Sequence, residues 1–256
     1  MACRGIRGEQ MGVTEYDGGG EWWMTSVSRD CITCAVKGAD CFCSLPAEAL
    51  VELQKIGSCL NYATGERPIH EGYAADRVYV MCHGRMKLTA SSPEGKLLIV
   101  RIAGPGDVLG LAAALKGTTH KVTAEALEPC EVKAIGRTEF TAFMGRFRDV
   151  SRNTALTMAL EYEGAILSAR RLALSGSASS KLASVLLQWG KMGGSANGKP
   201  LTFRMPLTHE ELGSMAGLSR ETVTRTLTKF RKDGLVAQEG ETMTLTRPAE
   251  MEELYG

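Results

Sequence analysis

The chain has 256 residues, of which 44% are hydrophobic and 23% are charged. These proportions exclude a fibrous repeat and a wholly disordered chain, and the length predicts two domains or one large one. The net charge of +1 excludes a uniformly basic nucleic-acid coat, although a local basic patch is still compatible with it. No apolar run approaches the roughly 18 residues of a membrane span, and residues 1–30 lack the apolar core of a secretion signal. We therefore expect a cytoplasmic protein with no membrane partner.

Cysteines are concentrated in the first half of the chain. Eight are present, none follows Cys130, and Cys31, Cys34, Cys41 and Cys43 fall within thirteen residues. Because no secretion signal is present, such clustering favours metal ligation or redox chemistry over a disulfide framework.

In chain order, residues 1–30 contain three consecutive glycines and no periodicity, so we interpret them as a flexible tail. Residues 31–140 carry the cysteine-bearing loop and then short apolar runs separated by glycine turns, a pattern typical of a β-sandwich or roll. The expected elements are a short helix at 46–53 and strands at 77–81, 86–89 and 97–102.

A long helix is predicted over residues 137–173, and we assign 141–174 as a dimerisation helix. Alternating spacings of four and three are typical of a two-stranded coiled coil. The residues with this spacing are Ala155, Ala159, Tyr162, Ile166, Ala169 and Ala173. Packing of the helix on its own domain is the alternative.

A serine-rich hinge then opens a separate domain, residues 175–256, with a predicted helix-turn-helix. Thr208 and Glu211 form a capping-box pattern that begins a helix running to about Ala216. Gly217 supplies a left-handed turn, and Ser219 caps a second helix that runs to about residue 232.

The second helix has the composition of a DNA-contacting element. Residues 220–232 contain five Lys or Arg and one acid, as phosphate neutralisation requires. Arginine can bond guanine, and glutamate can accept from cytosine. A structural helical hairpin is the alternative. The candidate DNA contacts are Thr208, Ser219, Arg220, Glu221, Thr224, Arg225 and Lys229.

The motif Ser219-Arg-Glu-Thr-Val-Thr-Arg, together with Gly104-Pro-Gly-Asp-Val-Leu-Gly and Ala124-Glu-Ala-Leu-Glu-Pro, resembles the Crp/Fnr family of transcription regulators. The resemblance implies an α+β fold with an N-terminal β-roll of the cyclic-nucleotide-binding, jelly-roll type. A long dimerisation helix and a C-terminal winged helix-turn-helix would follow. It also implies a homodimer that binds a near-palindromic double-stranded DNA site with TGA half-sites and contacts RNA polymerase. Arg220, Glu221 and Arg225 would contact bases.

The resemblance argues against cAMP as the effector. Family members that bind cyclic nucleotide carry a glutamate for the ribose and an Arg-Ser or Arg-Thr pair for the phosphate. The matching positions here hold Leu111, His120 and Lys121. Leucine accepts no hydrogen bond, so one anchor is missing.

The cysteine-rich loop is similar to the cluster loop of Fnr-type oxygen sensors, which hold a 4Fe–4S cluster. The resemblance implies Cys31, Cys34 and Cys43 as ligands, with Cys41 as the alternative third ligand. Cysteine thiolates are the ligands that such clusters require.

The fourth ligand is predicted to be Cys130, with Cys82 as the alternate. The resemblance places Lys133 where the family's fourth cysteine stands, three residues after Cys130. On a strand, an odd spacing puts the two side chains on opposite faces, so Cys130 needs a bulge or a turn near Pro129 to reach the cluster.

Other interpretations stay open. The four clustered cysteines could instead form a zinc site or a thiol switch, or a small molecule could occupy the roll. An enzyme is not expected, because no nucleophile elbow, phosphate loop or HExxH motif is present. The remaining class is a protein-interaction module.

Overall fold

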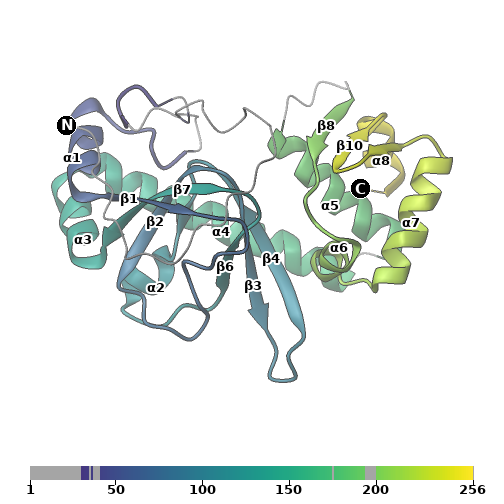
Figure 1. The fold of residues 1–256 in the computed structure, drawn as a ribbon, viewed down its shortest axis with the longest axis horizontal. Helices are drawn as coiled ribbons and strands as arrows, with labels where there is room; N and C mark the ends of the chain where they lie inside the picture. The colour runs from purple at the N-terminus through teal and green to yellow at the C-terminus, as the bar shows by residue number, and fades with distance from the viewer. Residues whose placement is uncertain (1–29, 35, 37–40, 175, 194–199, 256) are drawn as a thin grey trace, which may run out of the picture. The chain divides into compact units, whose positions relative to one another are not determined.

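The structure is a computed structural model, drawn as a ribbon in Figure 1. It describes residues 30–34, 36, 41–174, 176–193 and 200–255. The predicted tail at residues 1–30 therefore lies outside the described residues, except for Asp30. By internal contacts the chain divides into an N-terminal unit, Met1–Lys87 with Ile102–Leu160, and a C-terminal unit, Leu88–Arg101 with Glu161–Gly256.

The predicted β-roll is present and is made of two antiparallel sheets. The first sheet has the strand order β1 (Ser58–Tyr62), β7 (Cys130–Gly136), β2 (Arg77–His83) and β5 (Val108–Leu109). The second has the order β4 (Leu97–Ala103), β3 (Met86–Ser91) and β6 (Thr123–Ala126). The three strands expected from the sequence are thus confirmed as β2, β3 and β4.

Three helices accompany the roll: α1 (Ala47–Ile56), α2 (Leu111–Lys116) and α3 (Arg137–Arg146). Apolar side chains from these helices, from β2 and from the cysteine-bearing loop form one buried core. Its largest members include Phe42, Leu50, Leu53, Leu111, Ile135 and Phe140.

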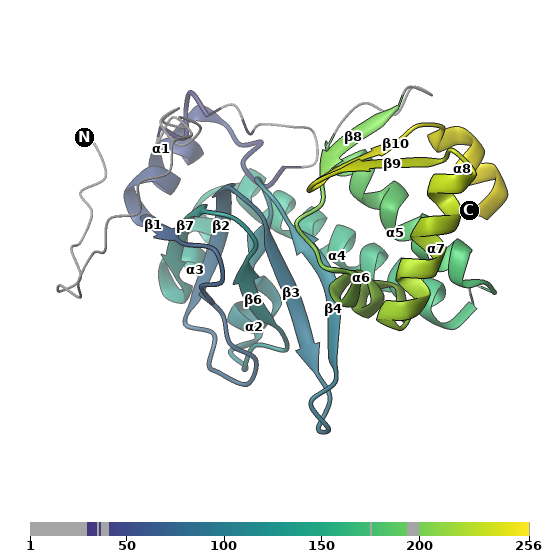
Figure 2. The ribbon, with the colours of Figure 1, turned by 45° about the vertical axis from the view of Figure 1, so that its right-hand side comes forward.

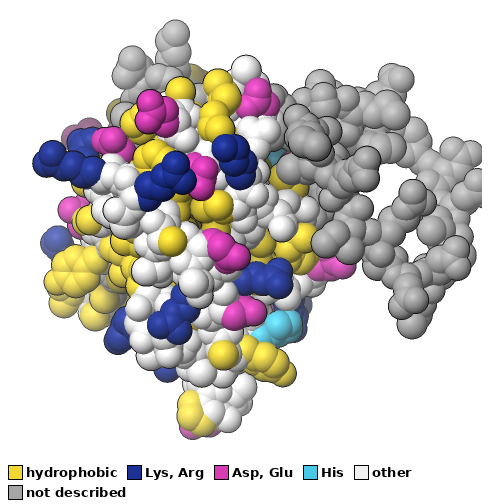
Figure 3. Space-filling view, turned by 90° about the vertical axis from the view of Figure 1, so that its left-hand side faces the viewer, with side chains coloured by type: hydrophobic (Ala, Val, Ile, Leu, Met, Phe, Trp, Pro, Cys, Tyr) yellow, Lys and Arg dark blue, Asp and Glu magenta, His cyan; other side chains and the backbone are white. Residues whose placement is uncertain are grey.

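On the face of the molecule seen in Figure 3, basic and acidic side chains are intermingled among apolar ones. This face therefore carries no block of one charge.

The long helix begins later than the sequence predicts. The helix expected from residue 137 is interrupted at Phe147, whose backbone is extended (φ −121°, ψ 113°), and α4 (Arg148–Leu174) follows. The Phe147 ring packs edge-on against Phe143 at 5.4 Å between ring centres. Phe147 is partly buried against the roll core, and Gly145, a poor helix former, stands two residues before it, so both favour a break at this point.

In the described part of the C-terminal domain, helices accompany a small sheet (Figure 2). The helices are α5 (Ala178–Gly193), α6 (His209–Ala216), α7 (Arg220–Lys232) and α8 (Pro248–Tyr255). The sheet order is β8 (Leu201–Arg204), β10 (Thr242–Leu245) and β9 (Val236–Glu239), and the β9–β10 hairpin is the wing. Among the described residues, no helix is long and apolar enough to cross a membrane.

Candidate functional site

The helix-turn-helix forms through the capping groups that the sequence predicts. Thr208 Oγ1 accepts from the backbone N–H of Glu211 at 3.2 Å, while the Glu211 carboxylate accepts from the backbone N–H of Thr208 at 2.8 Å. This reciprocal capping box begins α6. Gly217 ends α6 with φ at 65°, a left-handed conformation that favours glycine. Ser219 Oγ then accepts from the backbone N–H of Thr222 at 3.2 Å and begins α7.

The second helix, α7, has one buried and one exposed face. Val223, Leu227 and Phe230 are fully buried and pack α7 into the domain. The opposite face is exposed, and five of the predicted DNA contacts lie on it: Arg220, Glu221, Thr224, Arg225 and Lys229. The other two, Thr208 and Ser219, are also exposed, but their hydroxyls serve as helix caps. The spacing therefore gathers basic and hydrogen-bonding groups on one side of the helix.

Sequence reasoning missed one residue at this face, His209. Its Nδ1 lies 2.8 Å from Thr224 Oγ1, which also donates to the Arg220 carbonyl at 3.0 Å. Burial and the charges of Arg231 and Arg220 lower the pKa of His209. The sequence shows His209 as the first residue of α6 after the cap, but it gives no signal for the partner of His209 on α7.

Two charged side chains of α7, Glu221 and Lys229, have different local partners. Hydrogen bonds from its own backbone N–H and from Ser219, together with the nearby charge of Arg220, lower the pKa of Glu221, so it stays an ionised acceptor. The Lys229 ammonium lies over the Tyr255 ring, 5.4 Å from its centre.

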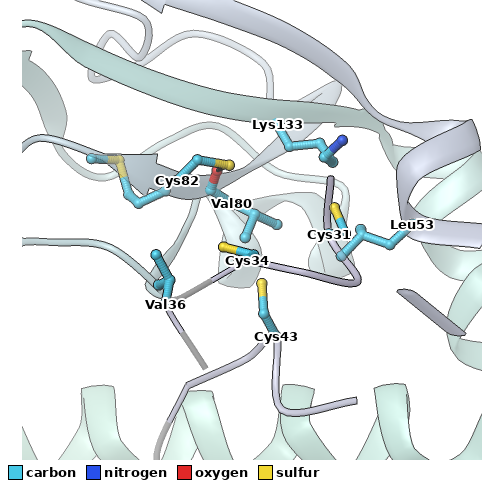
Figure 4. A pocket seen from close by; sticks show the side chains of 9 residues that line it. Cys31, Cys34, Val36, Cys43, Leu53, Val80, Cys82 and Lys133 are labelled. Carbon is cyan, nitrogen blue, oxygen red and sulfur yellow. Dashed lines mark hydrogen bonds between the residues drawn. The ribbon is translucent and has the colours of Figure 1, made fainter. Parts of the chain in front are cut away.

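The second candidate site is a pocket in the N-terminal unit where four cysteines meet (Figure 4). It encloses about 330 Å³, part of it open to solvent. In Figure 4 the four sulfur atoms point toward this space from different sides. The lining residues are Cys31, Cys34, Val36, Cys43, Leu53, Val80, Met81, Cys82 and Lys133.

Several contacts hold the cysteine-bearing loop against the roll. The Phe42 ring is buried beside Phe140, at 5.9 Å between ring centres, and the Phe42 N–H donates to the Gly106 carbonyl at 3.2 Å. The buried Asn153 amide on α4 donates to the carbonyls of Phe42 and Ser44, at 3.1 and 2.9 Å. These contacts fix the backbone on both sides of Cys43.

The structure brings Cys82, not Cys130, to the other predicted ligands. The pairing of β2 with β7 sets Val80 opposite Lys133, and Cys82, at the irregularity of this ladder, lines the same pocket as these two residues. Cys130 lies three residues before Lys133 and points to the other face, where its thiol donates to the carbonyls of Arg85 and Glu128, at 3.3 and 3.1 Å. No bulge intervenes in β7 between them, and the irregularity of the ladder lies in β2 at Cys82. The predicted fourth ligand, Cys130, therefore does not line this pocket, whereas its alternate, Cys82, does.

The alternative third ligand, Cys41, does not line the pocket. Its thiol lies 4.0 Å from the Gly106 carbonyl, and its sulfur accepts from the Cys43 N–H at 3.3 Å. Cys41 therefore supports the turn that carries Cys43 without facing the pocket.

The pocket disfavours free thiolates. Burial raises the pKa of Cys31 and raises that of Cys82 to about 12. A hydrogen bond with Cys41, followed by burial, raises the pKa of Cys43. Thiols in such surroundings ionise when a metal takes the proton's place. Within the described ranges, no three His, Cys, Asp or Glu side chains converge closely enough to hold a single metal ion.

The positions that correspond to cyclic-nucleotide anchors have other environments. Leu111 is buried in the roll core. His120 is buried as well, and burial lowers its pKa. Only Lys121 is exposed. The buried pair thus offers neither a carboxylate nor a cationic side chain to a nucleotide.

Two family models match the chain, a cyclic nucleotide-binding domain over residues 59–147 and a Crp-like helix-turn-helix domain over residues 180–254. The nitrogen fixation regulation protein FixK of Bradyrhizobium diazoefficiens is 28% identical over 88% of this chain and 93% of its own. The transcriptional activator protein FnrL of Cereibacter sphaeroides is 28% identical over 85% of this chain and 88% of its own length.

The fold also matches a solved structure, FixK2 from Bradyrhizobium japonicum. Its TM-score is 0.70 at 23% identity, over 78% of this chain and 98% of the other. Along the chain, the two matched domains stand on either side of α4, and α7 lies within the second of them. The chain belongs to the Crp/Fnr family of DNA-binding transcription regulators, a family of regulators and not of enzymes.

Proposed function

We propose that this regulator senses oxygen or redox state through a 4Fe–4S cluster held by Cys31, Cys34, Cys43 and Cys82. The observation that carries the proposal is the convergence of these four thiols, from two segments of the loop and from β2, on one pocket. Four cysteine thiolates are the full ligand set of such a cluster. A pocket with sulfur atoms on several sides suits a polyatomic cluster better than a single ion.

The chain's own residues supply the protection that such a group needs. Leu53, Val80 and Met81 line the pocket with apolar atoms, and Phe42, next to Cys43, is anchored in the core. When bound, the cluster supplies a centre that oxygen can oxidise and break down. The thiols would then be released into surroundings that raise their pKa values, which favours the protonated, metal-free loop.

Asn153 offers a route from the pocket to the long helix. Its amide holds the carbonyls of Phe42 and Ser44, next to Cys43 on either side, and Asn153 itself belongs to the second turn of α4. Rearrangement of the loop would therefore disturb the start of α4. We propose this contact as the link between cluster state and assembly.

Assembly is proposed to be a homodimer through α4. Every position of the predicted 4–3 repeat is exposed in the single chain, including Tyr162 and Ile166. A neighbouring row on the same helix is exposed as well, with Leu156, Leu160 and Leu167. An apolar strip of this length on a helix is typical of a surface that a second helix covers.

The dimer is proposed to bind a near-palindromic DNA site with half-sites about one helical turn apart, because two α7 helices must enter successive major grooves. RNA polymerase is the proposed protein partner, as for the family. FnrL is named as a transcriptional activator. Whether this chain activates or represses depends on where its sites lie.

The test is anaerobic purification followed by absorption spectroscopy and iron and sulfide analysis. We expect brown protein with iron and sulfide in similar amounts, loss of colour in air, and a parallel loss of DNA affinity. Colourless anaerobic protein that holds zinc would replace the proposal with the zinc interpretation. Metal-free protein whose DNA affinity follows thiol oxidation would support a thiol switch. A metal-free protein indifferent to oxidants would leave a small-molecule effector in the roll.

A further inference from the structure

Lys133 is a buried basic residue on the wall of the cysteine pocket. It is 2% exposed, and its side chain lies on the same side of the pocket as Cys31 in Figure 4. The two ladders of β7 fix this position, because Lys133 is paired with Cys59 on β1 and with Val80 on β2. Its Nζ lies 3.8 Å from Cys59 Sγ. The sheet therefore fixes the backbone from which the Lys133 side chain reaches the pocket.

The chain makes room for the Lys133 stem at Gly57. A Cβ at Gly57 would overlap the Cγ and Cδ atoms of Lys133. The backbone there is extended (φ −92°, ψ 134°), a conformation that any residue can adopt. The space that the Lys133 side chain occupies therefore requires a glycine at position 57, whereas the backbone conformation there does not.

The positive charge acts on the thiols around it. Lys133 lines the same pocket as Cys31, Cys34, Cys43 and Cys82, and it is almost completely buried there. A cation in an apolar pocket acts more strongly than one at the surface, because little water screens it. Lys133 thus favours negative charge in the space that the four sulfur atoms surround.

We infer that Lys133 raises the reduction potential of the cluster and stabilises its reduced form, while it is not itself a ligand. This inference rests on the proposed function. A cluster ligated by four thiolates is anionic, and one-electron reduction increases its negative charge. A nearby fixed cation stabilises the more negative state more strongly, and local charge is among the factors that set cluster potentials.

The test is an anaerobic redox titration of full-length protein, followed by absorption and electron paramagnetic resonance. Lys133→Met removes the charge and keeps an unbranched apolar stem, whereas Lys133→Arg keeps the charge. Gly57→Ala is a second variant that keeps every cysteine and the lysine but displaces the lysine stem. Lys87→Met is the matched control, since it removes a cation of the same roll that pairs with Glu125 at 2.7 Å and does not line the pocket.

We expect Lys133→Met and Gly57→Ala to retain iron and sulfide but to show a more negative midpoint potential. The expected shift changes the ratio of reduced to oxidised cluster at least tenfold, which is about 59 mV for a one-electron couple. Lys133→Arg and Lys87→Met should stay near wild type. A wild-type cluster whose potential is unchanged in Lys133→Met would overturn the inference and leave the proposed function intact. A wild-type protein without any cluster would overturn both.

Discussion

Replacing Glu221 by alanine separates one base contact from the rest of the DNA interface. Glu221 is fully exposed in the first turn of α7 and is ionised at neutral pH. The cap of α7 does not depend on it, because Ser219 Oγ accepts from the Thr222 N–H at 3.2 Å. We therefore expect the substitution to leave the fold and the stability of the domain close to wild type.

The effect should fall on sequence discrimination. A carboxylate that accepts from cytosine N4 is worth about 1–3 kcal/mol against the wrong base. At about 1.4 kcal/mol per tenfold, this is roughly a 5- to 150-fold loss of preference at one base pair of each half-site. Lys229→Ala is the matched comparison on the same face. It should weaken binding to all sequences similarly. The slope of log affinity against log salt concentration should become shallower by about one unit, as expected for the loss of one phosphate contact.

The assay is selection of binding sites from a random DNA pool, followed by salt titration of both variants on the wild-type site. Thermal melts of both variants serve as the folding control. If Glu221→Ala selects the wild-type motif while Lys229→Ala selects a different one, the assignment of base contact and phosphate contact is wrong.

Three further predictions concern assembly and stability. Ile166→Glu places a charge in the exposed seam of each α4, so it should give monomers by sedimentation and abolish DNA binding; a persistent dimer would contradict the proposed interface. Thr208→Ala removes the α6 cap and should cost about 1 kcal/mol in denaturant melts, and a variant as stable as wild type would show that the cap contributes nothing. Glu125→Gln should destabilise the roll at neutral pH, because burial, which raises the Glu125 pKa, is outweighed by the ion pairs with Arg67 and Lys87. Since the pKa of Glu125 in the folded protein lies below the ordinary value of a glutamate, this stabilisation is present above the ordinary value and is lost as the pH falls through the lowered pKa, so wild type and variant should converge in acid melts.

The helix-turn-helix could be predicted almost residue by residue because its signals are local. The capping pair Thr208 and Glu211, the turn at Gly217 and the cap at Ser219 each act within one turn of helix. The contact between His209 and Thr224 escaped prediction because it joins two helices, and its partner is fixed only by their packing.

The cysteine pocket could be predicted only in part, for the same reason. Cys31, Cys34 and Cys43 are close in sequence, so their shared location follows from one short loop. Cys82 joins them through the pairing of β2 with β7, which a single sequence does not specify. Side chains alternate between the two faces of a strand, and this alternation correctly predicted that Cys130 and Lys133 lie on opposite faces. The register of β7 is regular between these two residues, so no bulge turns Cys130 toward the pocket.

The central proposal, a cluster held by Cys31, Cys34, Cys43 and Cys82, is tested most directly by one comparison. Iron and sulfide are measured per chain in anaerobically purified wild type, Cys82→Ser and Cys130→Ser. Both variants replace a cysteine thiol of the roll by a hydroxyl, which is a poor ligand for iron, so the chemical change is the same at the two positions. We predict that Cys82→Ser loses most of the iron and sulfide while Cys130→Ser keeps the wild-type content. Loss in Cys130→Ser with retention in Cys82→Ser would contradict the ligand set that the pocket defines.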